Sequence, residues 1–147
     1  MPLLWHIDDG QHLLAVTAAT VDLVDGWCFE GFTTGTAALA AYRVRPLTDL
    51  PHVVLMDFFI GSERGDAVTR QLRRLDRHPH GMVIVGHSSV ASGSAAIVAA
   101  GGTLALPKHR NGQGINPDLV VYLQNWTSPA KAEGTVHGMQ DRKTRDP

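Results

Sequence analysis

The sequence has few of the features that mark several protein classes. It has a single cysteine, Cys28, among 147 residues, which excludes a disulfide framework and a cysteine-rich zinc site. Its apolar runs are short, the clearest being Val53–Met56 and Met82–Val85, whereas a membrane-spanning helix needs about 20 apolar residues. The amino terminus has no basic stretch and reaches two acidic residues, Asp8 and Asp9, almost at once, so we expect no secretory signal.

An excess of charge of one sign is also missing. Thirteen lysine and arginine residues stand against fourteen aspartate and glutamate residues, for a formal net charge of −1. Because a nucleic-acid-binding domain usually shows a basic face, we expect no direct nucleic-acid partner. Hydrophobic residues make up 44% of the chain, which is enough for a buried core. We therefore expect one compact, cytoplasmic domain with no membrane insertion.

Short apolar runs alternate with segments of helical spacing along the chain. Five runs have the length and pattern of strands: Leu3–Ile7, Trp27–Phe32, Val53–Met56, Met82–Val85 and Thr103–Leu106. Helical segments follow them over residues 13–24, 36–42, 68–75, 95–100 and 117–126. Asn116 before Pro117 is a typical helix start. Repeated strand–helix order predicts an α/β fold with a parallel sheet covered on both faces, over residues 1–127, followed by a polar tail over 128–147.

Charged side chains follow three of the predicted strands. Asp8 and Asp9 end the first strand, Asp57 ends the third, and Pro107 and Lys108 follow the fifth. The carboxyl ends of parallel strands meet at one edge, so these groups should converge. Three carboxylates would repel one another there, and Mg²⁺, which prefers oxygen ligands, would relieve the repulsion. Lys108 suits a phosphoryl oxygen, and Asp57 could act as a nucleophile that forms an acyl phosphate.

These residues resemble the receiver domain of two-component response regulators, over roughly Leu3–Trp126. The matching segments are HIDDG, HVVLMDFFIGSERG, MVIVGHSS and GGTLALPKH. Gly65, eight residues after Asp57, also stands where the family usually has glycine, and the 51-residue spacing from Asp57 to Lys108 suits the family. The resemblance implies a flavodoxin-like, doubly wound (βα)5 fold whose five parallel strands lie in the order 2-1-3-4-5.

The resemblance also implies a function. Asp57 would accept a phosphoryl group from a histidine kinase or a phosphotransfer protein, and Lys108 would contact that group. Mg²⁺ would be held by Asp8, Asp9, Asp57 and the backbone carbonyl of Phe59. The chain would be a stand-alone signalling receiver rather than an enzyme, and would act on a downstream protein target through its fourth helix, fifth strand and fifth helix. A homodimer is an open alternative.

The sequence departs from the family at the end of the fourth strand, where receivers carry serine or threonine. Alignment on the family's Ala/Gly-His-Ser segment places Val85 at that position, and a count without gaps places His87 there. We favour Val85, with Ser88 as a substitute hydroxyl donor from the loop.

Three further positions differ from the family pattern. Ala105 stands where an aromatic switch residue is common, and His109 and Gly61 replace prolines. Val85, Ala105 and His109 favour an alternative, a pseudo-receiver that serves as a binding or dimerisation module without phosphorylation.

Several single residues have other interpretations. Asp9 could cap the first helix, because aspartate is a favoured N-cap. Zinc binding by His78, His80 and His87 is disfavoured, because no cysteine accompanies them. Cys28 is interpreted as a small core residue. A hydrolase of the haloacid-dehalogenase type is disfavoured, because the segment at Asp57 reads DFFIG and lacks the second aspartate of that motif.

Overall fold

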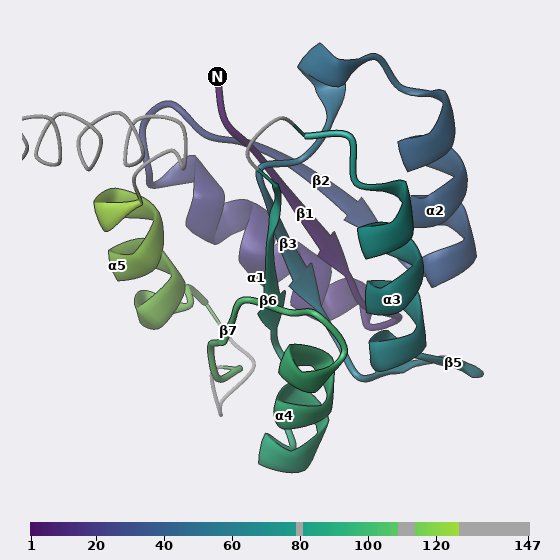
Figure 1. Ribbon diagram of the computed structural model, residues 1–147. Helices are drawn as coiled ribbons and strands as arrows, with labels where there is room; N and C mark the ends of the chain where they lie inside the picture. The colour runs from purple at the N-terminus through teal and green to yellow at the C-terminus, as the bar shows by residue number, and fades with distance from the viewer. Residues whose placement is uncertain (79–80, 109–113, 127–147) are drawn as a thin grey trace, which may run out of the picture.

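The computed structural model describes residues 1–78, 81–108 and 114–126 (Figure 1). The strands are β1 (Leu3–Ile7), β2 (Cys28–Phe32), β3 (Val53–Met56), β4 (Phe59–Ile60), β5 (Glu63–Arg64), β6 (Val83–Gly86) and β7 (Leu104–Ala105). The helices are α1 (Gln11–Asp22), α2 (Gly35–Val44), α3 (Gly65–Leu75), α4 (Ala91–Ala99) and α5 (Pro117–Asn125), with a 3-10 turn at Leu47–Asp49. The predicted tail, His80 and His109 lie outside the described residues.

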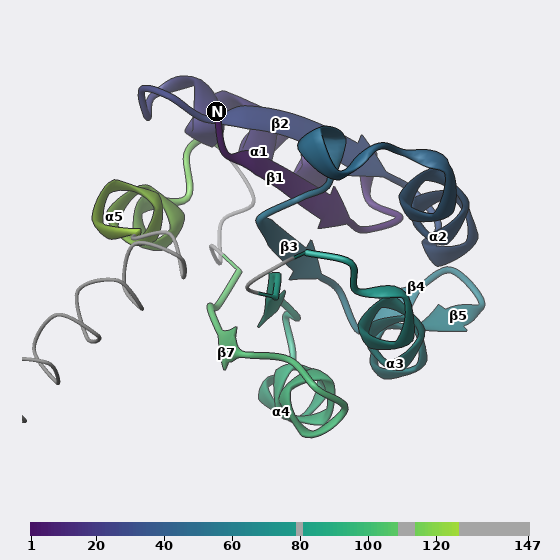
Figure 2. The same ribbon diagram turned by 45° about the horizontal axis from the view of Figure 1, so that its top comes forward.

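The main sheet confirms the predicted fold class. Its five strands are all parallel and lie in the order β2-β1-β3-β6-β7, which is the expected 2-1-3-4-5 order once the short hairpin β4–β5 is set aside. Helices α2, α3 and α4 lie along one face of the sheet, and α1 and α5 along the other (Figure 2). Within the described part of the chain no helix is long and apolar enough to cross a lipid bilayer.

The central strands are buried on both faces, as a continuous apolar run predicts. All four residues of β3 are buried, and their side chains alternate between two cores. Val54 and Met56 join the core beneath α2, α3 and α4, whereas Val53 and Leu55 join the core beneath α1 and α5. The same alternation determines the face of the sheet toward which the residues at the end of each strand point.

The fifth helix begins where the sequence signal places it. The Asn116 side chain accepts the backbone N–H of Leu119 at 3.2 Å, and Pro117 occupies the first turn. Leu119 and Leu123 of this helix are buried against the sheet. The fourth helix differs from prediction, because it begins at Ala91 rather than Ala95.

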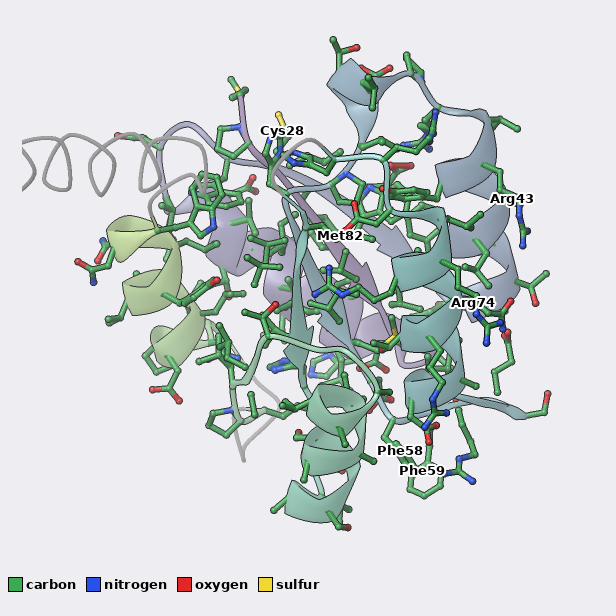
Figure 3. All side chains as sticks on the ribbon, viewed as in Figure 1. Cys28, Arg43, Phe58, Phe59, Arg74 and Met82 are labelled. Atoms are coloured by element: carbon green, nitrogen blue, oxygen red, sulfur yellow. The ribbon has the colours of Figure 1, made fainter. Side chains whose placement is uncertain are left out.

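The segment after Asp57 forms the antiparallel hairpin β4–β5, whose turn contains Gly61 at a positive φ of 61°. The interpretation of Cys28 as a core residue is wrong, because Cys28 is exposed on β2, an edge strand with only one neighbour. Figure 3 shows Cys28 at the opposite end of the molecule from Phe58 and Phe59.

Candidate functional site

The four charged residues singled out in the sequence meet at the carboxyl edge of the sheet. Asp8 and Asp9 follow β1, Asp57 follows β3, and Lys108 follows β7. Strands β1 and β3 pair Ile7 with Met56, which brings Asp8 level with Asp57. One carboxylate oxygen from each of Asp8, Asp9 and Asp57 lies within 4.8 Å of the others.

Lys108 bridges two of these carboxylates. Its Nζ lies 2.9 Å from Asp8 Oδ2 and 3.0 Å from Asp57 Oδ1. The side chains of Lys108 and Asp57 are 10% exposed, and that of Asp8 is 1% exposed. The ammonium therefore offsets part of the repulsion between two nearly buried negative charges.

The surroundings shift the pKa values of the three groups in different directions. Burial raises the pKa of Asp8, but the contacts with His6 and Lys108 and the hydrogen bond from Gly10 outweigh burial and bring the pKa to about 2. Burial and the charge of Asp8 raise the pKa of Asp57. For Lys108, burial lowers the pKa, but the contacts with Asp8 and Asp57 outweigh burial and raise it.

Backbone N–H groups hold the carboxylates in place. Asp8 Oδ1 accepts the N–H of Gly10 at 2.8 Å, and Asp57 Oδ1 accepts the N–H of Phe58 at 2.9 Å. Asp9 Oδ2 accepts the N–H of Gly61 at 3.1 Å, across the site in the hairpin turn. The capping interpretation of Asp9 is therefore wrong, because the N-cap of α1 is Gly10 and has no side-chain cap.

Gly65, the first residue of α3, packs directly against the backbone of Asp57 and Phe58. Its N–H donates to the carbonyl of Phe58 at 2.7 Å, and a Cβ built on it would lie 1.9 Å from the carbonyl oxygen of Asp57. Only glycine permits so close an approach of the two backbones. This steric requirement explains why glycine stands eight residues after Asp57.

The structure decides between the two alignments at the end of the fourth predicted strand, which is β6, and it contradicts the favoured one. Strand β6 pairs Leu55 with Val85 and Met56 with Gly86, so Val85 lies inside the core and His87 lies level with Asp57. The count without gaps is therefore correct and the placement of Val85 is wrong. Ser88 is buried in the segment between β6 and α4, where its Oγ accepts the N–H of Val90 at 3.1 Å.

A hollow lies beside Lys108, at the place of the missing aromatic residue. Ala105 is exposed on β7 and lines a hollow of about 450 Å³ together with Ser88, Ala95 and Lys108. The short side chain of Ala105 cannot fill this space, so the surface next to the acidic site has no aromatic side chain from β7.

Two phenylalanines follow Asp57 at the edge of the site. The rings of Phe58 and Phe59 meet edge to face with centroids 4.7 Å apart, and the Arg64 guanidinium lies 5.2 Å from the centre of Phe58 (Figure 3). Phe58 is half-buried against Gly93 of α4, whereas Phe59 is 61% exposed. The Phe59 carbonyl as a metal ligand stays a prediction.

The donor set fits a hard divalent cation. Three carboxylates converge, and their ligand atoms are all oxygens. Two of the carboxylates are nearly buried, which makes a bound positive charge favourable. His6 was missed in the sequence, although it precedes Asp8 by two residues in a strand and must therefore face the same side.

Comparison with known proteins identifies the fold. No protein-family profile and no curated protein matches the sequence. A response regulator from Burkholderia pseudomallei is 15% identical, with a TM-score of 0.66, and the match covers all of this chain and 76% of that one. A CheY-like receiver domain protein from Methanospirillum hungatei is also 15% identical, with a TM-score of 0.60 and 100% and 99% coverage.

A third structure extends the same result. The chemotaxis protein CheY4 of Vibrio cholerae is 20% identical, with a TM-score of 0.66, over 84% of this chain and 97% of that one. The chain therefore has the fold of the response regulator receiver domains.

Proposed function

We propose that this protein is a receiver whose Asp57 accepts a phosphoryl group in a Mg²⁺-dependent reaction. The observation that carries the proposal is the convergence of Asp8, Asp9 and Asp57 within 4.8 Å, with the Lys108 ammonium 3.0 Å from Asp57. None of these residues alone would indicate a function, but together they provide a nucleophile, a cation site and a fixed positive charge.

In the proposed reaction an Asp57 carboxylate oxygen attacks the phosphorus atom of a phosphohistidine. The new O–P bond forms as the P–N bond breaks, and the electron pair of that bond leaves with the histidine nitrogen. Mg²⁺, held by Asp8, Asp9, Asp57 and the Phe59 carbonyl, would neutralise charge on the phosphoryl oxygens. Lys108, already at Asp57, needs only a small movement to contact the transferred group.

The ions and the modified aspartate seen in structural neighbours support this assignment. The Burkholderia response regulator was solved with a phosphorylated aspartic acid and a calcium ion, and another neighbour, Rcp1, with Mn²⁺. We infer the same role for the acidic edge here, with a histidine kinase or phosphotransfer protein as the donor. On this proposal the chain is a cytoplasmic signalling domain and not an enzyme, and it acts on a downstream protein through α4, β7 and α5.

The second candidate is a pseudo-receiver that binds its partner without phosphorylation. It is favoured by His87, which stands level with Asp57 where receivers carry a hydroxyl group, and by the exposed Ala105 on β7. Ser88, the next residue in the sequence after His87, is the proposed substitute for the missing hydroxyl donor.

Incubation with acetyl phosphate and Mg²⁺, followed by intact mass measurement, separates the two candidates. We expect a gain of one phosphoryl group that is lost in Asp57→Asn and in EDTA. Asp25→Asn, which removes an exposed carboxylate in a turn, is the matched control and should keep the gain. No gain in the wild-type protein at saturating donor would contradict the receiver and support the pseudo-receiver.

A further inference from the structure

Two buried histidines lie beneath the acidic site and have no part in the proposed transfer. His6 is 1% exposed in β1, and His87 is 3% exposed at the end of β6. Their rings meet edge to face with centroids 5.4 Å apart. Both line a small cavity of about 10 Å³ with Thr17, Asn116 and Lys108, on the α1 and α5 side of the sheet.

The two rings contact different parts of the site. His87 Nδ1 donates to the carbonyl of Leu106 at 2.9 Å, two residues before Lys108. His6 Nε2 lies 3.3 Å from Asp8 Oδ2, the same oxygen that Lys108 approaches. His6 Nδ1, His6 Nε2 and Asp8 Oδ2 are all buried without a hydrogen-bond partner in the described ranges, so Nε2 and Oδ2 face each other at ion-pair distance.

Burying the polar imidazole of His6 at this position costs free energy of folding unless its nitrogens find partners. The neighbours of His6 on the same face of the sheet include Leu4, Leu55 and Val85, so an apolar side chain would pack there without an unpaired nitrogen. A buried polar group that is retained despite this cost needs a physical explanation, and the contact with Asp8 supplies one.

That explanation lies in the divided role of Lys108. In the resting site its ammonium serves both Asp8 and Asp57. When it turns to a phosphoryl group on Asp57, Asp8 Oδ2 is left almost fully buried without its ammonium partner, which is unfavourable for a carboxylate. The Nε2–H of His6 approaches the same oxygen from the strand itself and does not move with Lys108.

We propose that His6 is a positioning residue that holds the Asp8 carboxylate from beneath, so that Asp8 keeps its place as a metal ligand while Lys108 moves. The inference rests on the proposed function of the acidic site and names the support on which that site depends. Groups beyond the direct ligands typically change metal affinity by about 10–100-fold.

The test measures Mg²⁺ affinity by isothermal titration calorimetry in the unphosphorylated full chain. We expect His6→Leu to weaken Mg²⁺ binding about 10–100-fold and His6→Gln, which keeps an N–H donor, to restore most of it. His52→Gln, at the other end of the sheet, is the control and should leave the affinity unchanged.

Lys108→Met imitates the departure of the lysine. In that background His6→Leu should weaken Mg²⁺ binding by a larger factor than in the wild-type background, because Asp8 Oδ2 then has neither donor. Nitrogen-15 spectra of the wild-type protein without metal provide a readout that does not depend on a variant folding. We expect a proton on His6 Nε2, the nitrogen that faces Asp8.

Each outcome has a separate meaning. Equal Mg²⁺ affinity of wild type and His6→Leu, or a His6 proton on Nδ1, overturns the inference while leaving phosphorylation of Asp57 intact. Weakened Mg²⁺ binding in His6→Leu together with no phosphorylation of the wild-type protein overturns the proposed function and supports the inference. Absence of Mg²⁺ binding by the wild-type protein overturns both.

Discussion

The two ends of the same sheet are built in opposite ways. At the carboxyl ends of the strands, nearly buried charges are held close together around Lys108. At the amino ends, rings pack against one another: the Trp27 and Trp126 centroids are 5.1 Å apart, and His52 lies 6.0 Å from Trp126 and 5.0 Å from His78. Leu3 donates its N–H to His52 Nδ1 at 3.1 Å.

The comparison indicates that the amino ends of the strands contribute to stability and that the carboxyl ends hold the reactive groups. The ring cluster contributes packing without bringing like charges together. At the acidic end, burial and then the repulsion from Asp8 raise the pKa of Asp57, and the Lys108 ammonium relieves part of that repulsion. We therefore expect changes at the acidic end to depend on Mg²⁺, and changes at the amino end to leave Mg²⁺ binding unaffected.

The largest expected effect comes from the backbone beneath the acidic end. Gly65→Ala places a Cβ 1.9 Å from the Asp57 carbonyl oxygen and should lower the free energy of unfolding by about 3 kcal/mol or more. Gly61→Ala is the control, because it has a positive φ but open space around it, and should cost about 1 kcal/mol. Urea denaturation measures both, and equal losses would refute the steric argument.

Lys108→Met sharpens the comparison through the metal. Removing the ammonium leaves Asp8 and Asp57 facing each other, so the free energy of unfolding should fall by about 1–3 kcal/mol. Saturating Mg²⁺ should restore most of the loss, since it supplies positive charge to the folded state alone. Arg74→Met, an exposed cation on α3, is the control. A loss that Mg²⁺ leaves unchanged would show that Lys108 does not share the cation's role.

Acid should weaken both ends, but the carboxyl end more. Burial lowers the pKa of His87 to about 3, and burial also lowers that of His52. The unfolded chain then binds more protons than the folded chain below about pH 6.5. The free energy of unfolding should fall as pH drops through that value, by up to about 1.4 kcal/mol per pH unit for each group.

Variants at the two histidines measure this difference. We expect the loss between about pH 6.5 and 5.5 to shrink in His87→Gln, and to shrink less in His52→Gln, which replaces the less buried ring. An unchanged pH profile in His87→Gln would contradict a neutral, buried His87.

The smallest effect is expected at Cys28. This residue is exposed on the edge strand, with its Sγ 3.2 Å from Met1 Sδ, so maleimide should modify it readily in the native protein. The modified protein should unfold within about 0.5 kcal/mol of the unmodified one and bind Mg²⁺ equally well. Protection of the thiol until the protein unfolds would restore the rejected interpretation of a core cysteine.

Much of the acidic site follows from sequence, because it depends on local patterns. The run Val53–Met56 marks a buried strand, and Asp57 comes directly after it. Asp8 and Lys108 follow other predicted strands, and parallel strands end at one edge. Their meeting therefore requires only that the sheet forms.

Other features could not be predicted in this way. The level of His87 relative to Asp57 depends on the register between β3 and β6, which a count of residues leaves open to a shift. The bond from Gly61 to Asp9 depends on a hairpin of two-residue strands, too short to show an alternation. Cys28 is exposed because β2 lies at an edge, and position in the sheet is not written in the strand.

The amino-acid sequence by itself determined five strands, their parallel arrangement and the acidic character of one edge, because alternation, apolar runs and helix starts act over a few residues. Only the tertiary structure decided that Lys108 bridges Asp8 and Asp57, that His6 approaches Asp8 and that His87 lies level with Asp57. These contacts join residues far apart in the chain, and their distances are set by how strands align and helices pack.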